Sequence, residues 1–290
     1  MGTPYPMSPG HEIVGTIASA GANVGNDWKQ GALVGVGWNG GYCTRCQPCR
    51  LGDFTACQNS KVTGVNKDGG HQEYVIAHWT ALVKMPENSG ISNAELAPLL
   101  CAGNTVWEAL HASPARAGDV VVVSGLGGLG HLALQYARKM GFIVVAVSGS
   151  KDKADLAKKL GAHYYFSAED DVAAEVGKLG GAKAAIATAP SAKAISSLVP
   201  LLSRYGEVIV VGVPGDGNLE VSAMALVSKR AALRGYSCGA SAENEKTIKF
   251  SVAEDVKAMV HKFPLDKAND ALDGVLNGKP KFRVSCLDIG

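Results

Sequence analysis

A glycine-rich turn between an apolar run and a helical pattern constrains the fold of this chain more than any other feature. The run Val120–Ser124 has the length and composition of a buried strand, and a G-x-G-x-x-G sequence follows it at 125–130. From 131 to 140 the apolar residues recur with helical spacing. A strand, a tight turn and a helix in this order predict a dinucleotide-binding unit.

Each glycine of the turn has a separate expected role. Gly125 permits the tight turn, Gly127 lets the backbone approach a pyrophosphate, and Gly130 allows the helix to pack closely on the strand. Unpaired N–H groups of the first helical turn would meet the phosphates. The alternative is a glycine-rich turn in an unrelated α/β protein. The candidate cofactor-binding residues here are Gly125, Gly127, Gly128, Leu129 and Gly130.

Strands and helices alternate after this turn, which predicts an α/β fold with a parallel sheet. Residues 1–103 differ, because short apolar runs there are separated by Gly, Pro, Asn and Asp, as in a β-rich domain. The length of 290 residues is that of two domains. The expected strands after the turn lie at 143–147, 183–187, 207–211, 231–233 and 282–286, the expected helices at 153–160, 193–202, 252–260 and 265–275, and the apolar runs of the β-rich region at 13–14, 33–36 and 74–76.

The end of the second strand bears on the choice of dinucleotide. An Asp or Glu normally stands there and binds the ribose 2′-OH. In this chain Ser148, Ser150 and Lys151 occupy that stretch, and no acid lies among residues 147–151. Two hydroxyls and a cation would donate to a 2′-phosphate that a carboxylate would repel, so NADP is favoured over NAD. The alternative is that Lys151 is simply solvated at the start of a helix.

Four of the seven cysteines lie within fifteen positions, as Cys43-x2-Cys46-x2-Cys49-x7-Cys57. An odd total without a secretory signal argues against a disulfide framework and favours metal binding. Four thiolates with short spacings describe a closed, tetrahedral, structural zinc site. An iron–sulfur cluster is the alternative, but its usual spacings differ.

Five motifs in a fixed order resemble those of the zinc-dependent medium-chain alcohol dehydrogenases, in the branch of microbial alcohol and cinnamyl-alcohol enzymes. The resemblance runs the whole length of the chain and implies a Rossmann domain with a doubly wound parallel sheet (104–238), inserted in a GroES-like β-barrel domain (1–103 and 239–290). The motifs are Gly-His-Glu at 10–12, the four-cysteine segment, 68–74, 101–105 and the glycine turn at 125–130.

The resemblance also implies the roles of individual residues. His11 and Cys101 would hold a catalytic zinc, with Glu12 beside the metal or exchanging onto it. Taken alone, His11 could be a core histidine and Cys101 a small buried hydrophobic residue. Thr105 would lie against the nicotinamide and Arg283 near the cofactor phosphates. The implied reaction interconverts primary or aromatic alcohols and aldehydes, with zinc as Lewis acid and hydride passing to NAD(P).

One departure from the family is the short segment before His11. The family's first zinc cysteine and its Ser/Thr-Asp proton relay lie upstream of Gly-His-Glu, and the ten residues that precede His11 contain neither. We therefore expect an N-terminally truncated, incomplete barrel. The alternative is a catalytically impaired short form that retains the cofactor-binding fold and the structural zinc. A zinc-free quinone reductase of the same superfamily is disfavoured by the cysteine segment and Cys101.

The overall charge and hydropathy exclude other classes of partner. A net charge of +2 gives no electrostatic footprint for nucleic acid. No apolar run approaches the roughly 18 residues that span a bilayer. A cytoplasmic protein is expected because no secretory signal is visible. A homo-oligomer is expected because a Rossmann sheet has edge strands that can pair.

Overall fold

The computed structural model describes residues 3–277 and 285–288, which form two compact units. The first unit combines Met1–Asn104 with Cys238–Gly290, and the second is the intervening Thr105–Ser237. The expected strand at 282–286 lies partly outside the described residues, which contain it only from Ser285 onward.

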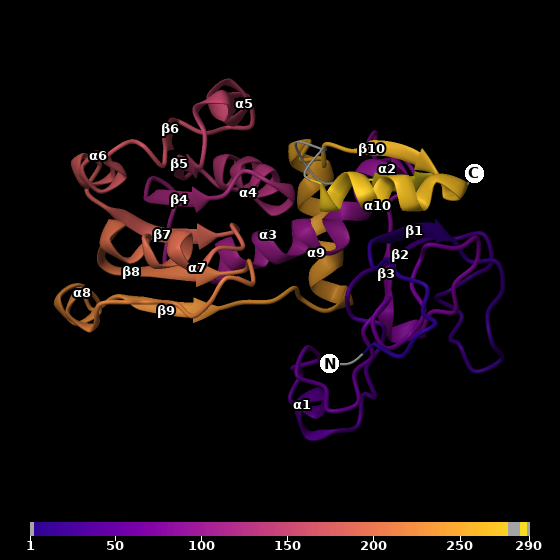
Figure 1. Ribbon diagram of the computed structural model, residues 1–290. Helices are drawn as coiled ribbons and strands as arrows, with labels where there is room; N and C mark the ends of the chain where they lie inside the picture. Colours follow the sequence, from indigo (N-terminus) through magenta and orange to yellow (C-terminus); the bar gives the residue numbers. More distant parts are fainter. Residues whose placement is uncertain (1–2, 278–284, 289–290) are drawn as a thin grey trace. The chain divides into compact units, whose positions relative to one another are not determined.

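A six-stranded parallel sheet forms the centre of the second unit, with strand order β6-β5-β4-β7-β8-β9. Figure 1 shows β4, β7, β8 and β9 as arrows that point the same way. The chain winds outward from β4 first in one direction and then in the other, which is the doubly wound Rossmann order. The strands are β4 (Val120–Ser124), β5 (Ile143–Ser148), β6 (Tyr164–Ser167), β7 (Ala182–Ala187), β8 (Leu202–Val210) and β9 (Ala232–Gly235).

The core of this unit follows from the register of the sheet. Val145, Val122, Ala185 and Val208 are paired in a row across four neighbouring strands, and all four are fully buried. Each buried valine contributes about 1.5–3 kcal/mol of hydrophobic stabilisation. The helices are α3 (Ala102–Ala112), α4 (Gly128–Lys139), η3 (Lys151–Lys153), α5 (Ala154–Lys159), α6 (Val172–Lys178), α7 (Ala192–Ser196), η4 (Val199–Leu201) and α8 (Ala223–Lys229), of which α3 begins in the first unit.

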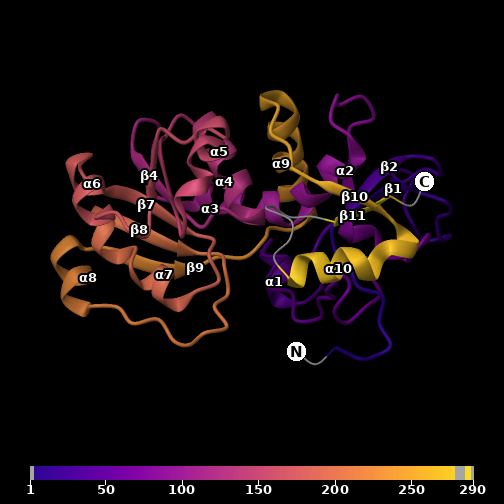
Figure 2. The same ribbon diagram turned by 45° about the horizontal axis from the view of Figure 1, so that its top comes forward.

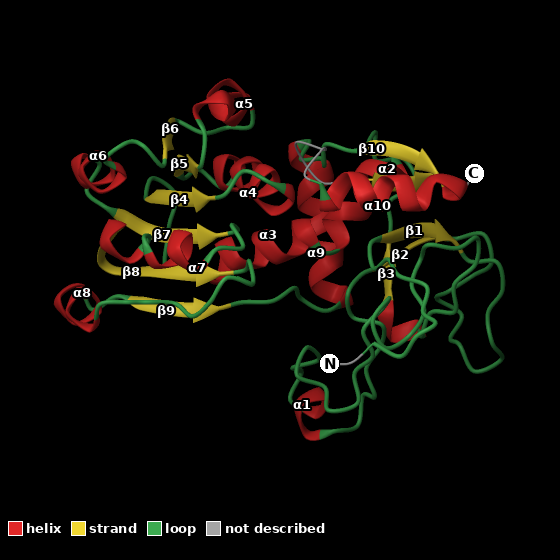
Figure 3. Ribbon diagram, viewed as in Figure 1, coloured by secondary structure: helices red, strands yellow, loops and turns green. Residues whose placement is uncertain are grey.

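The first unit contains a three-stranded antiparallel sheet, β1-β2-β3, and a parallel pair, β10-β11. Much of it is loop, as Figure 3 shows, and α10 runs alongside β10 and β11 in Figure 2. Its elements are β1 (Ile13–Thr16), β2 (Leu33–Val36), α1 (Gln47–Arg50), η1 (Trp79–Ala81), β3 (Leu82–Lys84), α2 (Asn93–Leu96), η2 (Ala97–Leu100), α9 (Ser241–Glu254), β10 (His261–Pro264), η5 (Leu265–Lys267), α10 (Ala268–Leu276) and β11 (Ser285–Asp288).

The α/β fold class is confirmed, but two local expectations are wrong. The run at 74–76 is no strand: Tyr74 is 75% exposed and Ile76 is 88% exposed. The helix expected at 252–260 is instead α9, which ends where Asp255 adopts a left-handed conformation with φ 53°. No helix in the described part of the chain has both the length and the apolar character needed to cross a membrane.

Three of the four buried residues of α9 are polar, so hydrophobic periodicity does not reveal this helix. Asn244, Thr247 and Ser251 are all at most 3% exposed. The hydroxyls of Thr247 and Ser251 donate to carbonyls four residues earlier in the helix. Such internal hydrogen bonds let polar side chains be buried at small cost. The helix begins where the Ala240 N–H donates to the Glu243 carboxylate, at 3.1 Å.

Candidate functional site

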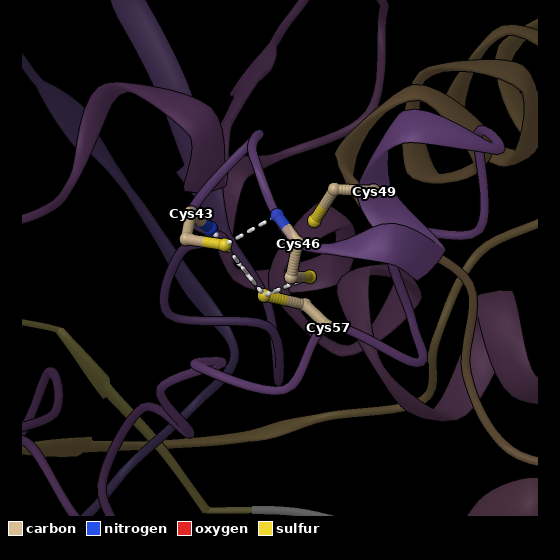
Figure 4. Close-up of side chains that lie close together, drawn as sticks. All are labelled: Cys43, Cys46, Cys49 and Cys57. Carbon is tan, nitrogen blue, oxygen red and sulfur yellow. Dashed lines mark hydrogen bonds between the residues drawn. The ribbon is translucent and has the colours of Figure 1, made fainter.

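The four cysteine sulfurs of the predicted structural site converge in the first unit (Figure 4). All four lie within 4.8 Å of one another, and the Sγ of Cys57 is 3.7 Å from that of Cys43 and 3.9 Å from that of Cys46. Sulfur ligands at about 2.3 Å from a tetrahedral zinc lie about 3.8 Å apart. The spacing of these thiols therefore fits a zinc ion held by four cysteines.

The backbone of residues 43–59, the four-cysteine lobe, places several N–H groups beside the sulfurs. The N–H groups of Cys46 and Asn59 donate to cysteine sulfurs at 3.4 Å, as does that of Cys43 to Cys57. Such donors favour the thiolate, and the N–H groups of Arg45 and Cys46 lower the pKa of Cys43 to about 6. Burial has the opposite effect and raises the pKa of Cys49 to about 12. Burial of Cys49 therefore disfavours its thiolate, and a bound cation would favour it.

Aromatic packing fixes the lobe to the rest of its unit. The rings of Tyr42 and Phe54 are stacked with centroids 4.7 Å apart, beside the buried Cys49 and Cys57. The Tyr42 hydroxyl contacts Ser241 Oγ at the start of α9. The lobe is thus joined to the start of α9 through Tyr42, and Ala240 packs in the same buried cluster.

A second group of potential metal ligands consists of His11, Glu12 and Cys101. Their donor atoms lie within 4.8 Å of one another, although Cys101 is some 90 positions further along the chain. His11 and Glu12 directly precede β1, and Cys101 lies between η2 and α3. A nitrogen, an oxygen and a sulfur donor form a set that zinc binds, and catalytic zinc sites use three protein ligands.

Each member of this group is oriented by a neighbour. The Ala102 N–H, at the start of α3, donates to Glu12 Oε1 at 3.1 Å. The edge of the His11 ring meets the Trp38 ring, with centroids 4.9 Å apart. A hydrogen bond with Cys238, together with burial, raises the pKa of the Cys101 thiol, while the contact with His11 acts in the opposite direction.

The glycine turn in the second unit has the three properties expected of it. Gly125 has φ 98°, a left-handed conformation that favours glycine. A Cβ on Gly130 would lie 1.9 Å from the Gly125 carbonyl oxygen, so α4 packs tightly on the turn. A Cβ on Gly127 would meet no atom within 4 Å, so the backbone there faces open space. Gly127 precedes the first residue of α4, whose unpaired N–H groups can bind a phosphate.

The residues expected to bind a 2′-phosphate have carboxylate neighbours. Ser148 ends β5 and is buried. The Ser150 hydroxyl donates to Asp152, and Lys151 Nζ lies 2.9 Å from Glu169 Oε2. Asp152 is visible beside the motif in the sequence, whereas Glu169 follows β6 and is brought to Lys151 only by the fold.

Two predicted cofactor-binding residues, Thr105 and Arg283, remain, together with two residues that were not predicted. Thr105 is buried on α3 in the second unit, and Arg283 lies outside the described residues. No pattern in the sequence indicates Trp38 beside His11, or Cys238 near enough to Cys101 to affect its pKa. Cys238 was visible only as an isolated cysteine.

Comparison with known proteins identifies relatives along the whole chain. Residues 1–87 match the alcohol dehydrogenase GroES-like domain, and residues 128–253 match the zinc-binding dehydrogenase family. Alcohol dehydrogenase patD of Penicillium expansum is 39% identical over 286 residues, which cover 98% of this chain and 82% of the relative.

Solved structures show the same similarity. The cinnamyl alcohol dehydrogenase of Sorghum bicolor aligns with a TM-score of 0.86 and 30% identity, over 99% of this chain and 85% of that one. The CAD of Helicobacter pylori, solved in complex with NADP(H), aligns with a TM-score of 0.83 and 26% identity, over 97% of this chain and 81% of that one.

Two glycine-to-alanine variants test the packing of the turn. Gly130→Ala places a methyl group 1.9 Å from the Gly125 carbonyl oxygen, so we expect it to lower the free energy of unfolding by about 1–3 kcal/mol. Gly127→Ala is the matched control, because its methyl group enters open space and should leave stability nearly unchanged. Denaturant unfolding measures both. Equal stability of the two variants would show that α4 does not approach Gly125 this closely.

Proposed function

The chain belongs to the zinc-binding alcohol dehydrogenase family of medium-chain dehydrogenases, and we propose that it interconverts primary or aromatic alcohols and aldehydes by zinc-dependent hydride transfer to NAD(P). The observation that carries this proposal is the convergence of the His11, Glu12 and Cys101 donor atoms in a chain that also has the dinucleotide turn. The named relatives act on alcohols, which supports the same substrate class here.

The His11, Glu12 and Cys101 group would hold the catalytic zinc. When bound, zinc is a Lewis acid that lowers the pKa of an alcohol and so favours loss of hydride from its carbon. The protein's own contribution is orientation. Trp38 fixes the plane of the His11 ring, and the N–H at the start of α3 fixes the Glu12 carboxylate.

The glycine turn would bind the pyrophosphate of the dinucleotide. Gly127 leaves room for it, and the N–H groups at the start of α4 would donate to its oxygens. Thr105 would lie against the nicotinamide and Arg283 near the phosphates. The four-cysteine lobe would hold a second zinc, whose closed ligand set gives it a structural role.

We infer NADP as the preferred dinucleotide and a homo-oligomer as the assembled form. The hydroxyls of Ser148 and Ser150 and the Lys151 cation support the first inference, as does the NADP(H) bound to the Helicobacter relative. Exposed residues along β9, at the edge of the sheet, support the second.

A second candidate is a short form with impaired turnover that keeps the cofactor fold and the structural zinc. It applies if Glu12, whose Oε1 accepts the Ala102 N–H, does not bind the metal through its other oxygen, because the zinc would then rest on His11 and Cys101 alone. Turnover by the zinc-loaded chain distinguishes the two candidates.

Removal of one ligand should abolish most of the activity. Cys101→Ser takes away the sulfur donor, and because metal catalysis is worth several kcal/mol, we expect kcat/KM for benzyl alcohol to fall by about 100-fold or more. NADP reduction at equal protein concentration gives the rates, and metal analysis should show one zinc lost per chain. Unchanged kcat/KM would rule out a role for Cys101 in catalysis. A parent chain that binds two zinc ions without turnover would support the impaired form.

The zinc of the four-cysteine lobe should be lost independently of the zinc at Cys101. Cys46→Ser removes one of four thiolates, so zinc should be released and the melting temperature should fall, because metal binding at such sites is also folding free energy. Metal analysis and thermal unfolding measure the two effects, with Cys101→Ser as a control that keeps the lobe intact. Full zinc retention by Cys46→Ser would contradict the four-thiolate site.

Cofactor preference should follow the charge at the end of β5. Ser148→Asp places a carboxylate beside the 2′-phosphate, so we expect the ratio of NADPH to NADH dissociation constants to rise about tenfold or more, a change of about 1.4 kcal/mol. Glu169→Gln frees Lys151 and should shift the ratio the other way. Fluorescence titration measures both constants. Tighter binding of NADH than NADPH by the parent would show that these donors do not select NADP.

A further inference from the structure

A tyrosine side chain of the second unit reaches from β6 to the segment that follows β5. Tyr165 lies in β6, where it is the register partner of Ala146 in β5. Its hydroxyl donates to the carbonyl oxygen of Ser150, an exposed residue two positions beyond the end of β5. Burial raises the pKa of Tyr165, so the hydroxyl keeps its proton and is a donor at neutral pH.

The segment that Tyr165 contacts lies beside the glycine turn. The Gly125 N–H donates to the Val147 carbonyl at 2.8 Å, which joins the start of the turn to the end of β5. Gly149 is exposed, and a Cβ on it would meet no atom within 4 Å. A dinucleotide whose pyrophosphate binds the turn would therefore bring its adenosine ribose to residues 148–151.

The carbonyl oxygens of this segment affect the two dinucleotides in opposite ways. A carbonyl oxygen repels a 2′-phosphate, whereas it can accept a hydrogen bond from the 2′-OH of an unphosphorylated ribose. Donors from β6 and the residue after it engage two of these oxygens. The Ala168 N–H donates to the Ser148 carbonyl at 3.0 Å, and the Tyr165 hydroxyl donates to the Ser150 carbonyl. Both serine carbonyls are thus directed toward β6.

We propose that Tyr165 is a specificity-determining residue of the dinucleotide site, and that its hydroxyl holds the Ser150 carbonyl away from a 2′-phosphate. The proposal rests on the NADP preference inferred above and adds to it a residue that removes a repulsive oxygen. The groups then left to meet the phosphate are the serine hydroxyls and the Lys151 cation. Without the Tyr165 hydroxyl, the Ser150 carbonyl is free to turn outward, where it repels a 2′-phosphate and accepts a 2′-OH.

This role differs from a role in packing by its dependence on the ligand. Loss of a packing contact at Tyr165 would disturb the segment after β5 for every adenosine ligand alike. Loss of the hydrogen bond to the Ser150 carbonyl weakens binding only where the ligand carries a negative charge at the 2′ position. A comparison of two ligands that differ only in the 2′-phosphate therefore separates the two roles.

The substitution Tyr165→Phe removes the hydroxyl and keeps the ring. The probes are adenosine 2′,5′-bisphosphate and 5′-AMP, and calorimetric titration of the 290-residue chain gives both dissociation constants. We expect the constant for the bisphosphate to rise about three- to tenfold, the range for loss of one hydrogen bond, and that for 5′-AMP to stay within about twofold. Neither probe carries a nicotinamide, so the result does not depend on turnover or on zinc.

The matched control is Tyr164→Phe, in the neighbouring tyrosine of β6, whose side chain points to the opposite face of the sheet and is 41% exposed. It should change neither constant. In a parent that prefers the bisphosphate, equal weakening of both probes by Tyr165→Phe, or no change in either, would overturn the role of Tyr165 and leave the NADP preference standing. A parent that binds 5′-AMP as tightly as the bisphosphate would contradict the NADP preference and, with it, the role of Tyr165.

Discussion

The first unit depends on Asn104, because that side chain joins the two chain segments from which the unit is built. Its oxygen accepts the Gly239 N–H, and its nitrogen donates to Thr247 Oγ1 at 3.0 Å on α9. The side chain is fully buried, so any one of these partners left unpaired would cost about 1–3 kcal/mol. The hydrogen bonds of this side chain are therefore complete only when both segments are docked. Cys101 lies three residues before Asn104, beside the start of α3.

The two metal-ligand groups use this framework differently. The four-cysteine lobe is local in sequence, and its N–H···S bonds and aromatic base shape it around the sulfurs. The His11, Glu12 and Cys101 group is assembled from distant parts of the chain and has ligands of three kinds. A closed set of four thiolates stabilises the fold, whereas a mixed set of three leaves room for substrate. One chain thus contains a group suited to structure and another suited to chemistry.

Predictability from the sequence follows the range of the interactions. The strand Val120–Ser124 and the turn after it were predicted because an apolar run and glycine spacing are local signals. The helix α9 does not follow from hydrophobic periodicity, since three of its four buried residues are polar and two of these form hydrogen bonds within the helix. Tyr164–Ser167 (β6) was missed because, at the sheet edge, it is only partly buried. The Asn104–Gly239 hydrogen bond has no local signal at all, because it forms only once α3 and the segment before α9 are docked.

The choice between NAD and NADP is governed by a competition that the sequence shows only in part. Lys151 and Glu169 are an exposed pair, with side chains 67% and 73% exposed, and such pairs are worth at most about 1 kcal/mol. A phosphate with two negative charges attracts the same lysine more strongly than one carboxylate does. Glu169 therefore competes only weakly for Lys151, because both side chains are exposed to solvent. Ser148 is different: it is buried at the end of β5, where a carboxylate would be fixed in place and could not turn away. On the proposed function, selection between the dinucleotides would rest on the one buried position of the motif more than on its exposed cation.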